Sequence, residues 1–406
     1  MTVASQHAVV ARLGTTQTLA WASSYYLPAV LAAPLAADIG IPITHIFGAF
    51  SLALVLSALV GPRAGRALDE WGGRTVLATT SVLFAVGLTA LGMAQTDWQM
   101  WAAWALIGVG MGSGLYDAAF AAVVRMYPAN ARSAITGITL LAGFASTVGW
   151  PLTAWWNEIF GWRGTCFAWA CLHILLGLPL HLSLPKATRA NAKPISQALT
   201  ESHAGHASPV APRWMMGALA SVFAITWFTS TAMAAHLPML LQMQGLTASA
   251  ALGIAMLVGP AQVIARVLEF GLLRHVHPFH SARLAAAAHP LGVLGIVALG
   301  PAAAWLFASL HGAGNGILTI AKGTLPLVMF GSAGYGERQG WLMIPARFAQ
   351  ASAPALFGMA VVRWEGAALW LTAGLGLLTV LILQGIVVGW SRSEASNPLS
   401  PPPLSH

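Results

Sequence analysis

The sequence predicts an all-α integral membrane protein in which twelve transmembrane helices form two pseudo-symmetric six-helix bundles. Composition is the first reason, because 57% of the 406 residues are hydrophobic and only 7% are charged. Soluble proteins carry about 25% charged residues, so most of this protein's surface must face lipid. The second reason is a series of long apolar runs. The third is a charged segment between two of these runs that recurs in the second half of the chain.

Twelve runs are long enough to cross a bilayer, which takes about 20 mostly apolar residues. The first six are residues 13–37, 44–62, 75–94, 98–124, 133–156 and 162–184. The last six are residues 214–241, 248–273, 284–300, 304–330, 341–362 and 366–390.

These runs divide the chain into a first bundle at residues 1–184 and a second bundle at residues 213–392. Residues 185–212 are rich in Ala, Ser, Pro and His and have no apolar period, which predicts a flexible linker. Residues 393–406 end in a proline-rich stretch that cannot form a helix, so we expect a disordered tail.

The distribution of Lys and Arg predicts a multi-pass protein of the cell inner membrane with both termini and the linker in the cytoplasm. With the N-terminus inside, fourteen of the 19 basic residues fall on the cytoplasmic side, and Arg163 and Arg363 fall outside. The remaining three, Arg266, Lys322 and Arg347, lie within the runs. Since the basic residues stand singly in short loops, the net charge of +8 does not indicate a nucleic-acid partner. The first run reads as a retained span, not a cleaved signal.

The charged segment at residues 61–74, which we call the hinge, joins the second and third runs. Residues 65–69 (Gly-Arg-Ala-Leu-Asp) align with residues 265–269 (Ala-Arg-Val-Leu-Glu), and Arg74 aligns with Arg274. A charged hinge used twice at the same place indicates that the second bundle is a copy of the first.

Two further repeats support the duplication. A Leu-Pro pair at residues 27–28 recurs at 237–238, and a Gly-rich stretch at residues 108–114 recurs at 312–316. Small residues at such spacing let helix backbones approach closely, and Pro or Gly within spans marks kinks that transporters use near their cargo. Six spans, a linker and six related spans are typical of a secondary transporter.

Charged residues within the spans are the best indication of the cargo, because a charge near the bilayer centre costs at least about 2.5–3.5 kcal/mol. Four residues qualify: Asp117, Arg266, Lys322 and Arg347. Three cations against one anion predict a positive cavity and an anionic small-molecule cargo, since Arg grips a carboxylate with two parallel hydrogen bonds.

Alternatives to these roles stay open. Arg266 would equally pair with Glu269, which lies three residues further along the same helix face. Asp117 and Lys322 would equally pair across the two halves as a structural bridge or gate, in place of a proton site. Arg347 has no acid within one helical turn, which favours the cavity.

The uncharged candidates for cargo binding are Tyr25, Tyr26, His236 and Asn315. Both tyrosines and His236 immediately precede the repeated Leu-Pro pairs, and His236 can also titrate near neutral pH. Packing is the commoner role for an aromatic ring in an apolar helix, and that alternative stands beside the first.

No enzyme activity and no cofactor are expected. The sequence lacks the G-x-x-x-x-G-K-[ST] loop that would cradle ATP phosphates. The nearest approach to a metal cluster is His275-x-His277-x-x-His280, which has no carboxylate or cysteine beside it and fits a solvated loop better. Cys166 and Cys171 lie on different helix faces, so they indicate no disulfide or metal site.

The hinge resembles the signature G-x-x-x-D-[RK]-x-G-[RK]-[RK] of the major facilitator superfamily. Gly65, Asp69, Gly72 and Arg74 match this pattern, whereas positions 70 and 73 depart from it. The resemblance implies the major facilitator fold and a gating role for Asp69 and Arg74. Asp69 would face a helix N-terminus across the interface between the halves, where the helix dipole favours a carboxylate, and would hold the cytoplasmic side shut. The alternative is a plain topology signal with snorkelling arginines.

Within that superfamily, several pieces resemble the monocarboxylate and oxalate porter branch. They are residues 48–51 (Gly-Ala-Phe-Ser), residues 61–66, the stretch from Arg132 to Pro151, and Ala265-Arg266. The resemblance implies that Arg266 and Arg347 bind the anion. The acid that this branch carries before its arginine falls at Gln262 here.

The sequence therefore predicts a monomeric secondary transporter that moves a small, monocarboxylate-like organic anion by alternating access with proton coupling. Asp117 and Glu269 are the candidates for proton coupling or gating beside Asp69 and Arg74. The alternative function is efflux of a hydrophobic or toxic compound by proton antiport. A sensor built on the same scaffold is a third reading.

Overall fold

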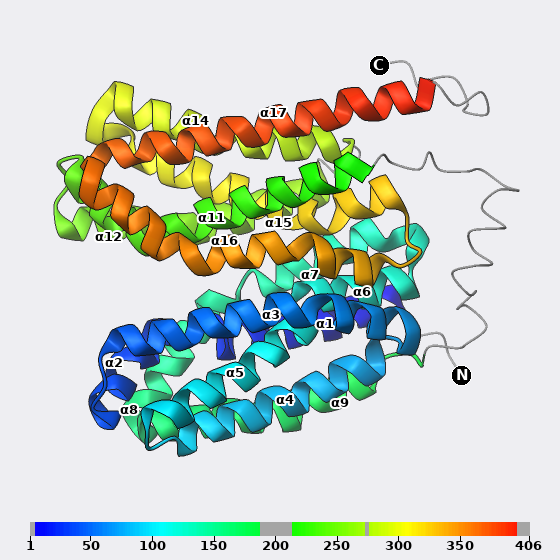
Figure 1. The fold of residues 1–406 in the computed structure, drawn as a ribbon, viewed down its shortest axis with the longest axis vertical. Coiled ribbons are helices and arrows are strands. Elements are labelled where there is room, and N and C mark those ends of the chain that lie inside the picture. The colour runs from blue at the N-terminus through cyan, green and yellow to red at the C-terminus, as the bar shows by residue number, and fades with distance from the viewer. Residues whose placement is uncertain (1–4, 187–212, 273–275, 396–406) are drawn as a thin grey trace, which may run out of the picture.

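The computed structural model describes residues 5–186, 213–272 and 276–395. Most of the expected linker and tail, together with Arg274 and His275, lie outside the described residues. Every element in these three ranges is helical. Figure 1 shows two groups of roughly aligned helices, with α1 to α9 in one half and α11 to α17 in the other.

The first half contains nine α-helices, two of which are joined by a π-helical turn at His173–Gly177. In chain order they are α1 (Gln6–Ser23), α2 (Pro28–Ile39), α3 (Ile43–Trp71), α4 (Gly73–Met93), α5 (Asp97–Gly114), α6 (Tyr116–Met126), α7 (Ala131–Ala142), α8 (Ala145–Leu172) and α9 (Leu178–Leu182).

The second half repeats the arrangement with longer, less interrupted helices. They are α11 (Arg213–Met243), α12 (Ala248–Ala255), α13 (Val258–Gly271), α14 (Pro278–Leu299), α15 (Ala304–Phe330), α16 (Tyr335–Trp364) and α17 (Ala368–Ala395).

The twelve predicted spans are confirmed. The described residues contain nine apolar helical stretches, and three of them, of 55, 53 and 57 residues, are twice as long as one crossing needs. Each of these three reverses direction at a residue with positive φ: Gly161 (66°), Gly300 (69°) and Glu365 (49°). The nine stretches are therefore twelve spans.

Three spans of the first half are broken near their middle, which the sequence pattern did not locate. The first span is interrupted between Ser23 and Pro28, where Pro28 begins α2. The fourth span is interrupted at Leu115, between α5 and α6, and the fifth at residues 143–144, between α7 and α8. The second break creates a helix N-terminus inside the membrane, and Asp117 lies in the first turn of α6. A helix N-terminus favours a carboxylate there.

Close helix packing explains the repeated glycines. A Cβ on Gly108 or Gly112 of α5 would lie 2.6 Å from backbone atoms of α3. In the second half, a Cβ on Gly312 or Gly316 of α15 would meet the backbone of α13 at 2.5–2.6 Å. The prediction that the small residues of these two stretches let helix backbones approach closely is therefore confirmed.

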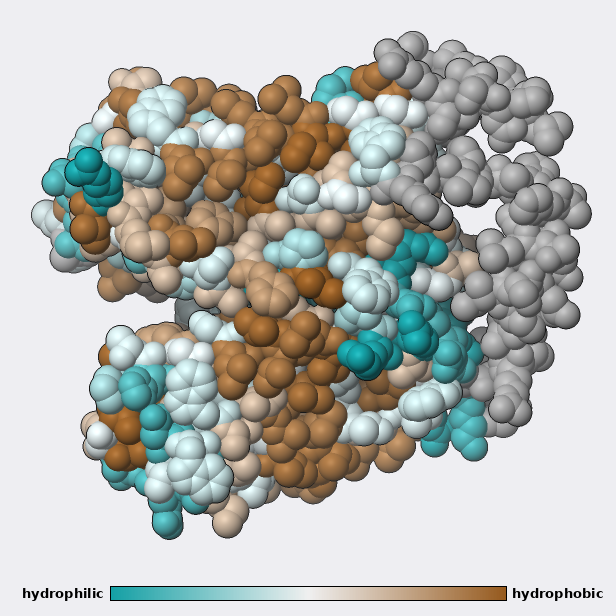
Figure 2. Space-filling model, viewed as in Figure 1, coloured by the Kyte–Doolittle hydropathy of each residue, from teal (hydrophilic) through white to brown (hydrophobic). Residues whose placement is uncertain are grey.

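The two halves meet at one end of the bundle and part at the other. At the end where the hinge joins α3 to α4, which we call the hinge end, α3 packs on α16 and α7 packs on α13 and α15. Figure 2 shows the halves separated at the opposite end, where α2 and α12 lie. Figure 2 also shows brown apolar side chains across the middle of both halves, as a surface in contact with lipid requires.

Candidate functional site

The centre of the interface between the halves holds three charged side chains, which we call the central ion cluster: Asp117, Lys322 and Arg347. Asp117 Oδ1 lies 3.1 Å from Lys322 Nζ, and Asp117 Oδ2 lies 3.2 Å from Arg347 Nη2. Lys322 and Arg347 are each 2% exposed. One carboxylate from the first half thus holds two cations from the second half, which leaves the cluster with one excess positive charge.

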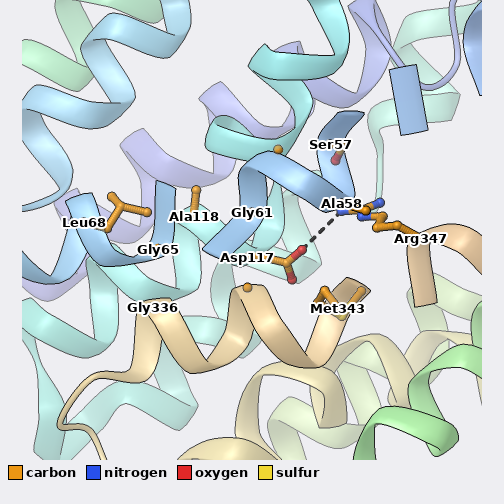
Figure 3. Close-up of a pocket in the computed structure, with 12 residues that line it drawn as sticks. Ser57, Ala58, Gly61, Gly65, Leu68, Asp117, Ala118, Gly336, Met343 and Arg347 are labelled. Atoms are coloured by element: carbon orange, nitrogen blue, oxygen red, sulfur yellow. Dashed lines mark hydrogen bonds and ion pairs between the residues drawn. The ribbon is translucent and has the colours of Figure 1, made fainter. Parts of the chain in front are cut away.

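The cluster resolves two expectations. Asp117 and Lys322 do pair across the halves, which was one of the two alternatives. Arg347 has no acid on its own helix within one turn, as expected, but it pairs with Asp117 from the other half. Arg347 and Asp117 nevertheless also line a small pocket between the halves. Figure 3 shows both side chains at this pocket, with the ion pair between them.

Two fully buried glutamines hold the cluster in place, and the sequence did not point to either. Gln339 Nε2 donates to Asp117 Oδ1 (3.3 Å) and to the carbonyl oxygen of Lys322 (3.2 Å). Gln350 Oε1 accepts a hydrogen bond from Arg347 Nη1 at 3.1 Å. Two buried polar atoms here have no hydrogen-bond partner among the described residues: Gln350 Nε2 and Gln339 Oε1. Lys322 Nζ has Asp117 Oδ1 at 3.1 Å as its one described acceptor, so its donor capacity is only partly used.

Tyr116, Phe120 and Trp227 lie beside the two cations, and Trp21 packs on Tyr116 and Trp227; we call these four rings the aromatic box. Lys322 Nζ lies 5.3 Å from the ring centroid of Trp227, 5.4 Å from Tyr116 and 5.8 Å from Phe120. Arg347 Cζ lies 5.6 Å from the centroid of Trp227. The rings of Trp21 and Trp227 come from opposite halves and are parallel within 3° at a centroid distance of 6.2 Å. The box therefore combines cation–π contacts with a flat stacking surface.

Tyr25 and Tyr26 adjoin the aromatic box at the break between α1 and α2. Their ring centroids lie 5.2 Å and 6.2 Å from that of Trp21. Both predicted tyrosines therefore lie at the edge of the aromatic box, in contact with Trp21.

Arg266 of α13 is buried at 4% exposure and reaches across the interface. Its guanidinium donates to the carbonyl oxygens of Thr139 (3.1 Å) and Gly316 (3.4 Å) and to Gln262 Oε1 (3.4 Å). A Cβ on Gly143 would overlap the guanidinium, so glycine makes the space that Arg266 occupies. The alternative pairing of Arg266 with Glu269 is wrong, and no carboxylate among the described residues pairs with Arg266.

Glu269 instead belongs to the contacts that close the hinge end. It forms an ion pair of 2.9 Å with Arg132, at the start of α7. The corresponding contact between α3 and α16 is the ion pair between Arg66 of α3 and Glu337, at the start of α16. In both ion pairs the arginine comes from the first half and the glutamate from the second.

Asp69 lies where the resemblance placed it. Its two carboxylate oxygens accept hydrogen bonds from the backbone N–H groups of Gly336 (3.0 Å) and Glu337 (2.9 Å) at the N-terminus of α16. That location is confirmed, whereas the gating role remains a proposal. Arg74 is half-buried at the start of α4 and forms no ion pair with a described residue.

Two predicted residues lie away from the central ion cluster. His236 Nε2 is 2.9 Å from the carbonyl oxygen of Pro354, within the second half and nearer the parted end. Asn315 lines a separate small pocket among α11, α14, α15 and α17, together with His289 and His311.

Metal binding finds little support in the described part of the chain. No three His, Cys, Asp or Glu side chains there come close enough together to hold one ion. His275 of the candidate cluster lies outside the described residues.

Comparison with known proteins identifies the fold. The family model described as Major Facilitator Superfamily matches residues 13–325. Three solved structures are similar over nearly the whole chain. The human organic anion transporter MFSD10 (TETRAN) is 16% identical, with a TM-score of 0.68, and the match covers 93% of this chain and 99% of that one.

The other two are transporters with different descriptions. The proton:xylose symporter XylE is 14% identical with a TM-score of 0.71, covering 94% of this chain and 95% of that one. FucP, in the outward conformation, is 14% identical with a TM-score of 0.70, covering 93% and 98%. At such low identity the likeness shows the fold alone, so the cargo must be argued from the site.

Proposed function

Because the chain belongs to the Major Facilitator Superfamily of multi-pass membrane transporters, we propose that it carries a small, monocarboxylate-like organic anion across the inner membrane. Transport proceeds by alternating access of a monomer and is coupled to protons. One observation carries the choice of an anion: the buried positive charge at the interface exceeds the buried negative charge. Lys322 and Arg347 share a single carboxylate, and Arg266 is held by neutral acceptors.

An uncompensated charge inside a membrane bundle is expensive, so its retention needs a reason. A carboxylate that enters beside Lys322 and Arg347 neutralises the excess charge of the central ion cluster. Such an anion satisfies Gln350 Nε2, which has no described partner, and accepts a further hydrogen bond from Lys322 Nζ, which pairs only with Asp117 among the described residues. Arg347 then offers the forked geometry that suits a carboxylate.

Alternating access requires a state closed at one end and open at the other. Here the Asp69 cap and the two ion pairs close the hinge end, while Figure 2 shows the other end parted. If the hinge is cytoplasmic, as the Lys and Arg distribution predicts, this is an outward-open state. FucP, which has a similar fold, is described in the outward conformation.

Asp117 offers a route for proton coupling, because among the described residues it is the one acid that pairs with both cations of the cluster. A proton on Asp117 removes its charge and raises the net charge of the cluster to +2, which favours entry of the anion. Loss of that proton restores the ion pairs and expels the anion. Proton and anion therefore move together without net charge.

The test is uptake of labelled carboxylates into proteoliposomes under an imposed pH gradient. We expect uptake by the wild type and at least a tenfold loss in Arg347→Gln and Arg266→Gln. Arg363→Gln, at the far end of α16 and outside the site, is the matched control and should transport normally.

Uptake of hydrophobic dyes with no response to carboxylates would overturn the proposal in favour of efflux. Normal carboxylate uptake by both arginine variants would show that the anion binds elsewhere.

A further inference from the structure

We propose that the anion carries a flat aromatic ring directly beside its carboxylate, and that Trp227 is the residue that selects this ring. The inference rests on the proposed function and narrows it from organic anions to aromatic carboxylates.

The position of Trp227 is the first step. Its ring is the one that lies near both cations of the central ion cluster, at 5.3 Å from Lys322 Nζ and 5.6 Å from Arg347 Cζ. A carboxylate that bridges these two cations must lie next to this ring. The group attached to the carboxylate then lies beside the ring of Trp227, which borders both cations.

The shape of the box is the second step. Trp21 and Trp227 present parallel faces from opposite halves, with an interplanar angle of 3°. Trp21 is buried, at 3% exposure, whereas Trp227 is half-buried and keeps part of its surface uncovered. At 6.2 Å between centroids the two indoles stack on each other, so a cargo ring extends this stack on the uncovered part of Trp227 and does not enter between them. A flat ring fits this surface better than a puckered or branched aliphatic group.

An unsatisfied donor is the third step. Trp21 Nε1 is buried and has no hydrogen-bond partner among the described residues. A buried indole N–H normally finds an acceptor. An oxygen on the cargo supplies one. If the rings only shielded the cations from lipid, nothing would require Trp21 Nε1 to lack a hydrogen-bond partner.

The approach to the site is the fourth step. Tyr25 and Tyr26 lie in the break between α1 and α2, and α2 runs on to the parted end. Tyr26 also contacts Trp150 at 5.6 Å between ring centroids. An aromatic anion therefore meets ring faces along its path, and not only at its destination.

The experiment compares benzoate with cyclohexanecarboxylate in direct binding to the purified full-length protein by titration calorimetry. The two acids have the same charge and the same number of non-hydrogen atoms, but only benzoate is flat and aromatic. We expect benzoate to bind about two- to tenfold more tightly, the range of one added aromatic contact. Benzamide, which has the ring without the charge, should bind far more weakly than benzoate.

Two variants locate the selectivity. Trp227→Leu should bind both acids with equal, weakened affinity, and Trp227→Phe should recover part of the preference for benzoate. Trp370→Leu, an exposed tryptophan on α17, should keep the full preference. Thermal unfolding of each variant establishes that it is folded.

The outcomes separate the two proposals. Equal affinity of the wild type for both acids, with binding lost in Arg347→Gln, overturns the aromatic inference and leaves the organic-anion function standing. No binding of either acid, or equal binding of benzamide and benzoate, overturns the organic-anion function itself.

Discussion

Gly65 of α3 and Gly336 of α16 meet backbone to backbone at the hinge end, so closely that a methyl group on Gly65 would overlap the Gly336 carbonyl group. The contact exists only while the halves are closed at this end, so the first prediction concerns it. Overpacking costs about 1–3 kcal/mol, and in Gly65→Ala this cost falls on the hinge-closed state alone. We expect the population to shift towards a state open at the hinge end.

Pulsed electron paramagnetic resonance between spin labels on the hinge-end loops of the two halves measures this shift. Gly217→Ala is the control, because a Cβ at Gly217 meets no atom within 4 Å. An unchanged distance distribution in Gly65→Ala would show that the contact between Gly65 and Gly336 does not control closure of the hinge end.

The second prediction concerns the cap that Asp69 provides for α16. Asp69→Ala removes both acceptors of the Gly336 and Glu337 N–H groups and should weaken the hinge-closed state by about 1 kcal/mol. Asp69→Asn keeps one acceptor and should recover part of this loss. The same spin-label distances report the effect, and equal behaviour of the Asn and Ala variants would rule out capping as the cause.

The third prediction compares the two ion pairs of the hinge end. Glu269 has only 4% of its side chain exposed, whereas the Arg66–Glu337 pair is 57% and 30% exposed. Glu269→Gln should therefore lower the free energy of unfolding by more than about 1 kcal/mol, and Glu337→Gln by less than that. Thermal unfolding in detergent measures both, and a larger loss in Glu337→Gln would contradict the expected order.

The fourth prediction tests Asp117 as the coupling group. Asp117→Asn leaves Lys322 and Arg347 without their acid, so an anion should still bind while the proton site is gone. We expect exchange of labelled anion for unlabelled anion to continue and uptake driven by a pH gradient to fall at least tenfold. Loss of both activities in a folded variant would show that Asp117 is needed for structure or for binding, and not for coupling.

The fifth prediction concerns the space that Gly143 leaves for Arg266. Gly143→Ala should push the guanidinium out of its place without removing its charge, and should weaken anion binding severalfold. Gly374→Ala, at a glycine with open space around it, is the matched control. Normal anion affinity in Gly143→Ala would show that the placement of Arg266 is unimportant.

The sequence predicted the twelve spans and the location of Asp69 because both depend on local patterns, namely run length and a short motif. It identified all three members of the central ion cluster, since a charge in an apolar run is conspicuous. It did not assign the partner of Arg347, because Asp117 lies 230 positions away in the chain and meets it only when the halves close.

The remaining misses share a physical cause. Trp21 and Trp227 look like ordinary packing residues in apolar helices, and nothing local shows that they meet across the interface. The i, i+3 rule suggested Glu269 as the partner of Arg266, but α13 packs on α7, and Arg132 provides a better-placed cation. The break at Leu115 puts Asp117 at a helix N-terminus. No proline lies near this break, so no local signal in the sequence marks it.

The ties from Asp117 to α15 and α16 have a consequence for the protein when it has no cargo. A proton on Asp117 without an anion beside it would leave Lys322 and Arg347 without their acid, in a medium that cannot solvate two bare cations. Under the proposed mechanism, a protein that holds only a proton therefore does not change orientation, and the membrane does not leak protons through partly loaded turnover. Dye-based pH measurements on cargo-free vesicles would show whether the bilayer remains tight.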